Sequence, residues 1–484
     1  MLSVILLFLF PVAGAILSMM VPKKRVTLVA LGSVTGMLVS LIWLFLQKPP
    51  GVWRVLAISW KWMSGAAAQG VFGILLDPLS TLMLLIVVVL GFLVILYGAG
   101  YISARNREHA SEEGRERHNF WLLLFIAAMI GVALSPNLLQ LFFFWELTTL
   151  CSWALISHYR NDESLRAGFK ALLMTFSGGL FFAAALVVLY VFTGRFDFDA
   201  ISELAPRLRF WVFLFFLIAA WAKSAQFPFY TWLPDAMAAP TTVSMYLHAA
   251  AMVKAGVFLI ARLTLANFTI PWLSGLIVAV CAVVTMLIAL FLFFTQNDLK
   301  KLLAYSTIAH LAYVFFGLGI AMMGSKLGAY AGAMHILNHS VAKGLLFLCV
   351  GVLSYAAGTR KIDELSGVAK KCPLLAIAFI CGMFALLGVP PFSGFWSKFY
   401  LLAATIQLGG VAGWLLLIPF LLEIILGFAW FLHVGHKVFF GTPSQRTLDA
   451  QPVPPSMQFA LVVLIILTLV APYAGLHLMQ AMGM

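Results

Sequence analysis

Charged residues are scarce in this chain: they occupy 10% of its 484 positions, whereas soluble domains carry about 25%. Hydrophobic residues make up 63% of the sequence. A chain of this composition cannot cover a folded surface with polar groups, so we expect a polytopic membrane protein rather than a soluble domain. No block of five residues carries one charge sign, so the net charge of +13 does not indicate a nucleic-acid partner.

Cysteine and the common cofactor motifs are also scarce or missing. The five cysteines form no CxxC pair and no Cys/His spacing typical of zinc, so we interpret them as small buried residues and expect no disulfide, iron–sulfur cluster or metal. The sequence has no Walker A motif, no GxGxxG after a strand, no CxxCH and no nucleophile elbow. We therefore predict no cofactor in this chain and place any electron chemistry in a partner.

Long apolar runs dominate the sequence, and a helix needs about 20 such residues to cross the hydrocarbon core. The runs predict an all-α polytopic fold with about fourteen transmembrane helices, at approximately 2–21, 27–47, 72–98, 119–135, 137–158, 168–193, 210–239, 243–265, 271–295, 301–323, 327–356, 373–404, 412–437 and 456–482. No low-complexity linker divides the chain, so we predict a single domain over 1–484.

The distribution of basic residues predicts an orientation. Loops after odd-numbered helices carry 18 Lys and Arg, and loops after even-numbered helices carry eight. The positive-inside rule then places the odd-numbered loops in the cytoplasm and both termini outside the cell membrane. The segment 48–71, with Trp53, Trp60 and Trp62, resembles a short hairpin outside the membrane.

Two of the predicted helices are interrupted in similar ways. KSAQFPFYTWLPDAM (223–237) and LGVPPFSGFWSKF (387–399) each place Pro, Phe and Trp inside an apolar run. The predicted helix breaks are at Pro228, Pro234, Pro390 and Pro391. Paired interrupted helices are typical of transporters built from inverted repeats, so we predict two five-helix repeats, at about 119–265 and 271–437.

Four lysines lie inside these apolar runs, namely Lys223, Lys254, Lys343 and Lys398. A lysine at the bilayer centre costs about 2.5–3.5 kcal/mol on insertion scales. Such residues persist when they have a function, and here they predict a charged path for protons or ions through an apolar protein.

Acidic residues at similar depth are the expected partners of two of these lysines. Glu146 lies in FFFWELTTL, and Lys223 is the expected partner by depth. Their pair is either a static link between helices or a switchable pair whose separation changes the proton affinity of both groups. Glu423 is the expected counter-charge of Lys398, unless Lys398 is only a lysine at a helix end.

The other two lysines are expected to relay protons. Lys254 lies about eleven residues into its helix, which is too central for easy snorkelling to the membrane surface. His335, His339 and Lys343 recur every four residues in HILNHSVAKGLLF and therefore share one helix face. This face is either a row for proton hopping or a satisfied polar helix interface.

Several segments resemble a known family. AKSAQFPFYTWLPDAMAAPTTVSMYLHAAAMVKAGVFLIAR (222–262), FWELTTL, HILNHSVAKGLLF and GVPPFSGFWSKF resemble, in order, the antiporter-like subunits of respiratory complex I and membrane-bound hydrogenases. GYISARNREH, CSWALISHYRND, KKLLAYSTIAHLAYVFFGL and VLSYAAGTR look most like the D-type subunit of hydrogenase-4. The resemblance covers nearly the whole chain.

The resemblance implies roles for individual residues. Glu146 and Lys223 match the family's input charge pair, and Lys254 matches its next relay position. His335, His339 and Lys343 match a further relay, and Lys398 matches the lysine that exchanges protons with the far side. The family often has Glu and Pro at Ala238 and Thr242, and Phe399 stands where an aspartate can follow the lysine, which raises interest in Glu423.

The expected function is that of a non-catalytic, proton-translocating subunit in a hydrogenase-4 or formate-hydrogenlyase-type complex. The resemblance implies other membrane subunits and a peripheral nickel–iron hydrogenase or iron–sulfur arm as partners, with protons or Na⁺ as the transported ion and lipid around the chain. The alternatives are a component like the A-type subunit of a multisubunit Na⁺/H⁺ antiporter, a membrane anchor whose buried charges are only structural and, as a weaker third, a quinone site.

Overall fold

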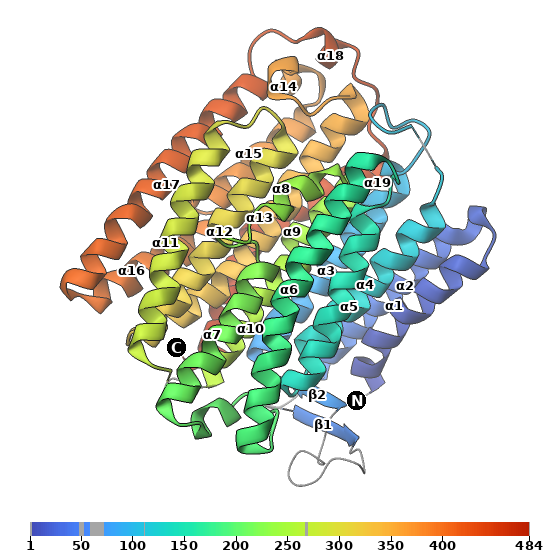
Figure 1. The fold of residues 1–484 in the computed structure, drawn as a ribbon. Coiled ribbons are helices and arrows are strands. Elements are labelled where there is room, and N and C mark those ends of the chain that lie inside the picture. The colour runs from blue at the N-terminus through green and yellow to red at the C-terminus, as the bar shows by residue number, and fades with distance from the viewer. Residues whose placement is uncertain (1, 48–52, 59–71, 111, 267–269, 484) are drawn as a thin grey trace.

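The computed structural model describes residues 2–47, 53–58, 72–110, 112–266 and 270–483. They form one bundle of long helices with a small two-stranded sheet at one end (Figure 1). The first half of the chain contains α1 (Leu2–Met20), α2 (Lys23–Leu46), β1 (Trp53–Ile58), β2 (Phe72–Leu76), α3 (Pro78–Tyr101), α4 (Arg115–Leu134), α5 (Leu138–Ile156), α6 (Asp162–Thr193), η2 (Ala200–Glu203), α7 (Pro206–Lys223), α8 (Trp232–Asp235) and η3 (Ala236–Ala238). The second half contains α9 (Thr241–Ala249), α10 (Met252–Ala266), α11 (Trp272–Phe294), α12 (Leu299–Met322), α13 (Leu327–Ala357), η4 (Ile362–Glu364), α14 (Val368–Lys371), α15 (Pro373–Leu387), α16 (Ser393–Leu408), α17 (Gly410–Phe439), α18 (Gln445–Leu448) and α19 (Pro455–Ala481).

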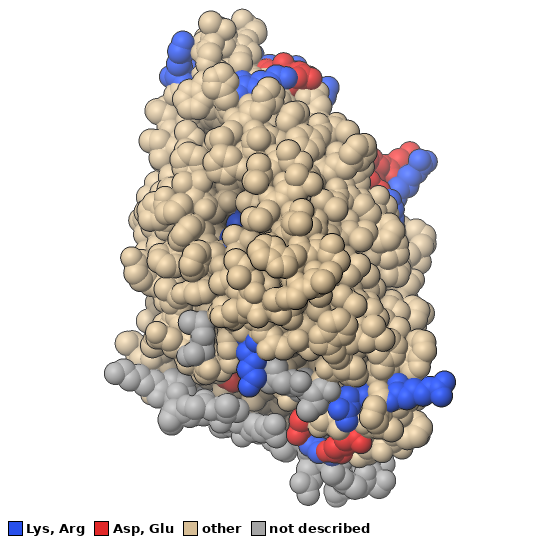
Figure 2. Space-filling view, turned by 90° about the vertical axis from the view of Figure 1, so that its left-hand side faces the viewer, with Lys and Arg blue, Asp and Glu red and all other residues tan. Residues whose placement is uncertain are grey.

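The all-α membrane fold predicted from the sequence is confirmed. In the described part of the chain, 12 helical segments are long and apolar enough to cross a membrane, with α9 and α10 counted as one. The two further spans predicted from the sequence correspond to the interrupted segments, α7 with α8 and α15 with α16. Charged side chains gather at the two ends of the face seen in Figure 2, with a broad band nearly free of charge between them.

The hairpin at the end of the bundle corrects one predicted boundary. Strands β1 and β2 pair antiparallel, with Trp53 opposite Leu76. The prediction of a helix from 72 onward is therefore wrong for Phe72–Leu76, because α3 begins only at Pro78, where the Asp77 side chain accepts a hydrogen bond from the Ser80 amide at 2.8 Å. The predicted hairpin segments 48–52 and 59–71, with Trp60 and Trp62, lie outside the described residues.

Both predicted helix interruptions are present. The peptide bonds Phe227–Pro228 and Pro390–Pro391 are cis, and each lies in the gap between two helical segments. The second part of the first interrupted helix is shorter than predicted, because only the single turns α8 and η3 follow the gap. Pro234 lies within α8 and not in the gap.

A third break was not predicted. The run 243–265 is two helices, because α9 ends at Ala249 and α10 begins at Met252. The amides of Ala250 and Ala251 both bond to the Tyr246 carbonyl, at 3.0 and 2.9 Å. The break lies directly before Lys254, which is the third residue of α10.

Helix α13 is the centre of the bundle. All residues of its apolar window are buried, and it packs against α3, α9, α12, α15, α16 and α19. A helix enclosed by protein can carry polar side chains without exposing them to lipid. The polar stripe predicted on residues 335–343 therefore lies in the interior of the protein.

Candidate ion-translocation path

The four lysines predicted in apolar runs lie inside the protein on four different segments. Lys223, Lys254 and Lys343 have no exposed surface, and Lys398 is 5% exposed. Among the described residues, the lysines that form direct ion pairs within 4.0 Å are others, at exposed positions. The buried lysines are held mainly by neutral groups.

Lys223 is the last residue of α7, and two groups of α5 hold it. Its Nζ donates to the Trp145 carbonyl at 2.8 Å and to the Thr149 hydroxyl at 2.5 Å. The ammonium also lies 5.0 Å from the centroid of the Trp145 ring, within reach of a cation–π interaction. The lysine at the end of α7 is thus bound by a single turn of α5.

Glu146, on the same turn of α5, is close to Lys223 but not bonded to it. The two side chains form no ion pair within 4.0 Å, although their charges interact electrostatically. The carboxylate lies against Gly179 of α6. It is so close that a Cβ atom, if Gly179 carried one, would lie 2.2 Å from Glu146 Oε1. Among the residues that the structure describes, Oε1 has no hydrogen-bond partner. The static ion pair considered from the sequence is not formed in this structure.

Lys254 reaches the polar stripe of α13. Its Nζ lies 2.5 Å from His339 Nδ1, so α10 and α13 share a lysine–histidine hydrogen bond. The lysine is fully buried and points to the interior, not to a membrane surface. This contact joins two residues that the sequence assigned to separate relays.

Three histidines form a cluster beside this contact. Nδ1 of His310, in α12, lies 3.1 Å from Nε2 of His335. The ring centroid of His310 lies 5.5 Å from that of His339. His335 Nδ1 in turn lies 2.8 Å from the Ser397 hydroxyl of α16. In the part of the chain that the structure describes, no group of three His, Cys, Asp or Glu is placed to hold a metal. Neutral imidazole both donates and accepts, so the cluster suits proton transfer.

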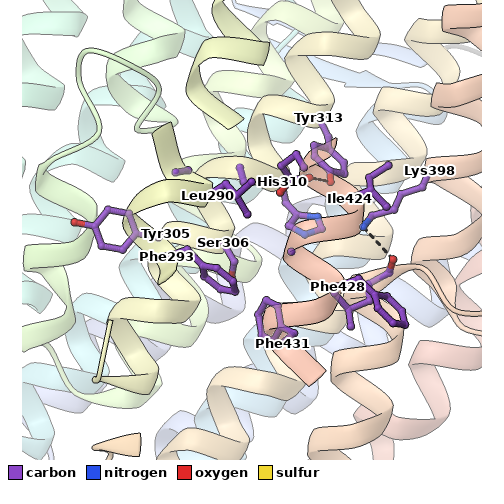
Figure 3. Close-up of a pocket in the computed structure, with 15 residues that line it drawn as sticks. Leu290, Phe293, Tyr305, Ser306, His310, Tyr313, Lys398, Ile424, Phe428 and Phe431 are labelled. Atoms are coloured by element: carbon purple, nitrogen blue, oxygen red, sulfur yellow. Dashed lines mark hydrogen bonds between the residues drawn. The ribbon is translucent and has the colours of Figure 1, made fainter. Parts of the chain in front are cut away.

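Lys343 is held by α12. Its Nζ donates to the Leu303 carbonyl at 2.9 Å and to the Ser306 hydroxyl. Ser306 also lines a small cavity of about 20 Å³, which has room for about one water molecule. The cavity is shown in Figure 3, and it extends from Ser306 to His310 and Lys398.

Lys398 and Glu423 meet at this cavity without direct contact. Lys398 Nζ donates to the Leu387 carbonyl, the last of α15, at 3.1 Å (Figure 3). The Tyr313 hydroxyl donates to Glu423, and Lys398 Nζ lies 5.2 Å from the centroid of the Tyr313 ring. Tyr313 therefore contacts both the lysine and the carboxylate that the sequence proposed as its counter-charge.

Sequence reasoning missed four buried polar residues near this path. They are His248, Lys300, His310 and Tyr313. Lys300, one of the 18 basic residues counted above in the loops after odd-numbered helices, is 1% exposed and donates to the carbonyls of Met237 and Ala239, at 3.2 and 2.6 Å. His310, like His335, is a histidine inside an apolar run, so the sequence could have predicted it as a relay residue in the same way.

Comparison with known proteins gives a consistent result for most of the chain. The profile of the family described as "NADH:quinone oxidoreductase/Mrp antiporter, TM" matches residues 135–426. A second profile, "NADH-Ubiquinone oxidoreductase (complex I), chain 5 N-terminus", matches residues 62–110.

Individual relatives agree with these profiles. The chain is 35% identical over 381 residues to the chloroplastic NAD(P)H-quinone oxidoreductase subunit 5 of Anthoceros angustus, covering 74% of this chain and 50% of that protein. It is 36% identical over 374 residues to the A-type subunit of the Na(+)/H(+) antiporter of Bacillus subtilis, covering 72% and 46%. A chain of the Mrp complex from Dietzia sp. DQ12-45-1b matches with a TM-score of 0.85 and 28% identity, covering 99% of this chain and 51% of that one. The chain spans about half the length of the curated relatives that it matches.

Proposed function

The chain belongs to the NADH:quinone oxidoreductase/Mrp antiporter family, and from that premise we propose that it is a proton-translocating membrane subunit. The observation that supports this most is the series of contacts between buried titratable groups. Lys254 bonds to His339, whose ring lies beside His310, and His310 bonds to His335. A protein gains nothing in stability from burying such groups together, because each loses hydration.

The transfer of charge is proposed to begin at Glu146 and Lys223. At 4 Å and an effective dielectric constant of 20, two unit charges interact by about 4 kcal/mol. Bringing the pair together or apart therefore changes the proton affinity of each group about a thousandfold. In the structure Lys223 donates to neutral partners and forms no ion pair within 4.0 Å with Glu146, so the two charges are not in their closest arrangement.

From the input pair, protons are proposed to pass laterally through the interior. Lys254, His339 and His310 form the first part of the route, and Lys343 lies one turn of α13 from His339. Lys398 with Glu423 is the proposed exit, and Tyr313 and the water-sized cavity connect it to the histidines. The Lys254–His339, His310–His335 and Tyr313–Glu423 contacts each join a donor to an acceptor, as proton hopping requires.

We further propose the two-repeat organisation within one domain, at about 119–265 and 271–437. The two interrupted helices support it, since each has a buried lysine next to its break. Lys223 is the last residue of α7, before the first break, and Lys398 lies in the first turns of α16, after the second. The interruptions free backbone carbonyls, and Lys398 donates to one of them.

The assembly proposed is a hydrogenase-4 or formate-hydrogenlyase-type complex in the plasma membrane, with a nickel–iron hydrogenase arm and both termini outside the cell. The segments GYISARNREH and VLSYAAGTR support this choice through their resemblance to the D-type subunit of hydrogenase-4. A component of a multisubunit Na⁺/H⁺ antiporter is the second candidate, and the similarity to the A-type subunit of Bacillus subtilis favours it to the same degree.

Everted membrane vesicles that carry the whole complex test the function and separate the two assemblies. Proton uptake is followed with a fluorescent ΔpH dye after adding hydrogen, formate or NADH in one arm, and NaCl without a reductant in the other. The redox assembly predicts uptake only in the first arm, and the antiporter predicts Na⁺-dependent proton movement in the second.

Variants of the input pair test the mechanism in the same vesicles. Glu146→Gln and Lys223→Met should each abolish coupled proton movement while reductant oxidation continues. Lys170→Gln, at an exposed ion pair with Asp235, is the matched control and should pump normally. Unchanged proton uptake in both input variants would show that the pair has no part in transport.

A further inference from the structure

A crevice of about 480 Å³ opens near α14 and α18, at the end of the bundle opposite the β1–β2 hairpin (Figure 1). Its walls are the first turn of α15, the first two turns of α19 and the loop 450–453 that precedes α19. Val352 of α13, Leu375 of α15 and Leu461 of α19 line its buried part. None of the lining residues belongs to the proposed ion path, so the crevice needs its own explanation.

The lining of this crevice is apolar except for three side chains. These are Lys371 and the amides Gln451 and Gln458, and no acidic residue lies among the described residues that line it. Both amides donate to backbone carbonyls of the protein at 2.9 Å. Lys371 is therefore the side chain of the lining that is best placed to bind a polar ligand.

Lys371 brings a positive charge to the exposed side of the crevice. It is the last residue of α14, and it is exposed, as is Lys370 before it. Among the described residues of this region, the lysines that form ion pairs are Lys361 and Lys437, and neither of them lines the crevice. Two unpaired lysines beside an apolar space are complementary to an amphiphile with an anionic headgroup.

The crevice lies at the level of membrane headgroups. Helix α19 has 27 residues and is about 40 Å long at about 1.5 Å per residue, whereas the hydrocarbon core is about 30 Å thick. The first turn of α19 therefore reaches the headgroup region. Next to the lining, the apolar side chains of Ile377, Phe459 and Val462 are 54%, 55% and 41% exposed. Since such side chains on spanning helices face lipid, the crevice opens toward the acyl chains.

We propose that this crevice binds one anionic phospholipid, with its phosphate at Lys371 and an acyl chain against Leu375 and Leu461. Apolar cavities exclude water and accept apolar groups, so the chain fills the buried part. A zwitterionic lipid brings an ammonium group to a lining that has lysines and no carboxylate, so an anionic headgroup is favoured. The lipid touches α13, α15 and α19 at once and holds their ends together. With the predicted orientation, it belongs to the cytoplasmic leaflet.

Cys372 lines the crevice and serves as an internal reporter. The purified complex is stripped of lipid in detergent and alkylated with a maleimide, and peptide mass spectrometry gives the rate for each cysteine. Phosphatidylglycerol should slow alkylation of Cys372 by at least about fivefold, and phosphatidylcholine with the same chains should need about a fivefold higher concentration. Cys281 and Cys381 are also half-buried but lie outside the crevice, so their rates should not change.

Two lysine variants provide a matched pair. Lys371→Gln removes the charge beside the crevice, and it should raise the concentration of phosphatidylglycerol that gives half-maximal protection by about fivefold. Lys361→Gln removes the same charge at an exposed position outside the crevice and should behave like the unmodified complex. Native mass spectrometry of the three complexes gives a second readout, since only Lys371→Gln should lose the retained phosphatidylglycerol.

Several outcomes would overturn the lipid site. One is equal protection by the two lipids, and another is equal protection in Lys371→Gln and Lys361→Gln. Protection by glycerol phosphate, which has no acyl chain, would show that a free phosphate ester is sufficient. If Cys372 reacts only after the subunits are separated, a neighbouring subunit fills the crevice. None of these measurements involves ion transport, so the lipid site and the proposed function fail independently.

Discussion

Replacing Gly179 with alanine tests whether the position of the Glu146 carboxylate controls transport. The new Cβ would lie 2.2 Å from Oε1, whereas an ordinary contact begins at 3.4 Å, so the carboxylate must move by about 1.2 Å. The obstacle is the end of a flexible side chain, so the cost to folding is small. The neighbouring Gly178→Ala is different, because its Cβ would meet Ala222 Cβ of α7 at 2.5 Å and force two helices apart.

The size of the effect follows from electrostatics. For two charges about 5 Å apart at an effective dielectric constant of 20, a change of about 1.2 Å alters their interaction by about 0.6 kcal/mol. This corresponds to about a threefold change in an equilibrium constant. Since Lys223 is the charge that acts on Glu146, Gly179→Ala should change coupled proton uptake about two- to fivefold without reducing the amount of complex.

A double-mutant cycle in everted vesicles provides the assay. The cycle uses Glu146→Asp, which keeps the charge and draws the carboxylate back from Gly179. If Gly179 acts only through the carboxylate, then Gly179→Ala has little further effect on uptake in that background, because the new methyl group no longer meets the carboxylate. Gly178→Ala should lower the amount of folded complex in both backgrounds. The same loss of uptake from Gly179→Ala in both backgrounds would refute the reasoning and assign the effect to helix packing.

Three further predictions follow from single contacts. Tyr313→Phe leaves the buried carboxyl of Glu423 without its hydroxyl donor, a loss of about 1–3 kcal/mol, so coupled uptake should fall about tenfold in the vesicle assay. Lys343→Arg keeps a positive charge but cannot release its proton, so uptake should be lost although the assembled complex is recovered on a native gel. Burial alone would raise the pKa of Asp77, but the charge of Arg262 and its hydrogen bonds lower it below the ordinary 3.8. The ion pair therefore stabilises the fold above about pH 4, and this stabilisation is lost as the pH falls through the lowered pKa of Asp77. The thermal unfolding midpoint in detergent should drop over that pH range, and it should drop less in Asp77→Asn.

The lysines and the two proline breaks were predictable because each contradicts its surroundings. A lysine or a segment with Pro, Phe and Trp can be recognised in an apolar run from the sequence alone. The break before Lys254 was not visible, since its residues include Ala249, Ala250 and Ala251, which are good helix formers. Both α9 and α10 pack against α13, a tertiary contact that local preference does not describe.

Pairing was harder to predict than burial. Depth along a helix gives one coordinate, and Glu146 and Lys223 share it, and both side chains reach Thr149, yet they form no ion pair within 4.0 Å. Glu146 lies against α6 and Lys223 against the Trp145 carbonyl, and neither orientation is encoded in spacing. In the same way, Lys398 and Glu423 line one cavity, but Tyr313, which contacts both of them, comes from a third helix.

The partners of the buried and partly buried cations differ between the helix ends and the proposed path. Arg262 pairs with Asp77, and Arg360 pairs with Asp298 and Glu108, near the ends of the helices. A carboxylate partner stabilises the charged form, and arginine does not release its proton, so these pairs fix the ends of the bundle.

The lysines of the interior donate instead to carbonyls, hydroxyls or an imidazole. Lys223, Lys343 and Lys398 each donate to a backbone carbonyl. A carbonyl accepts a hydrogen bond from an amine as well as from an ammonium, so the site does not have to rearrange when the proton leaves. A neighbouring carboxylate would hold the proton in place by several kcal/mol. A buried lysine can therefore release and regain a proton when its direct partners are neutral and the carboxylates lie further away.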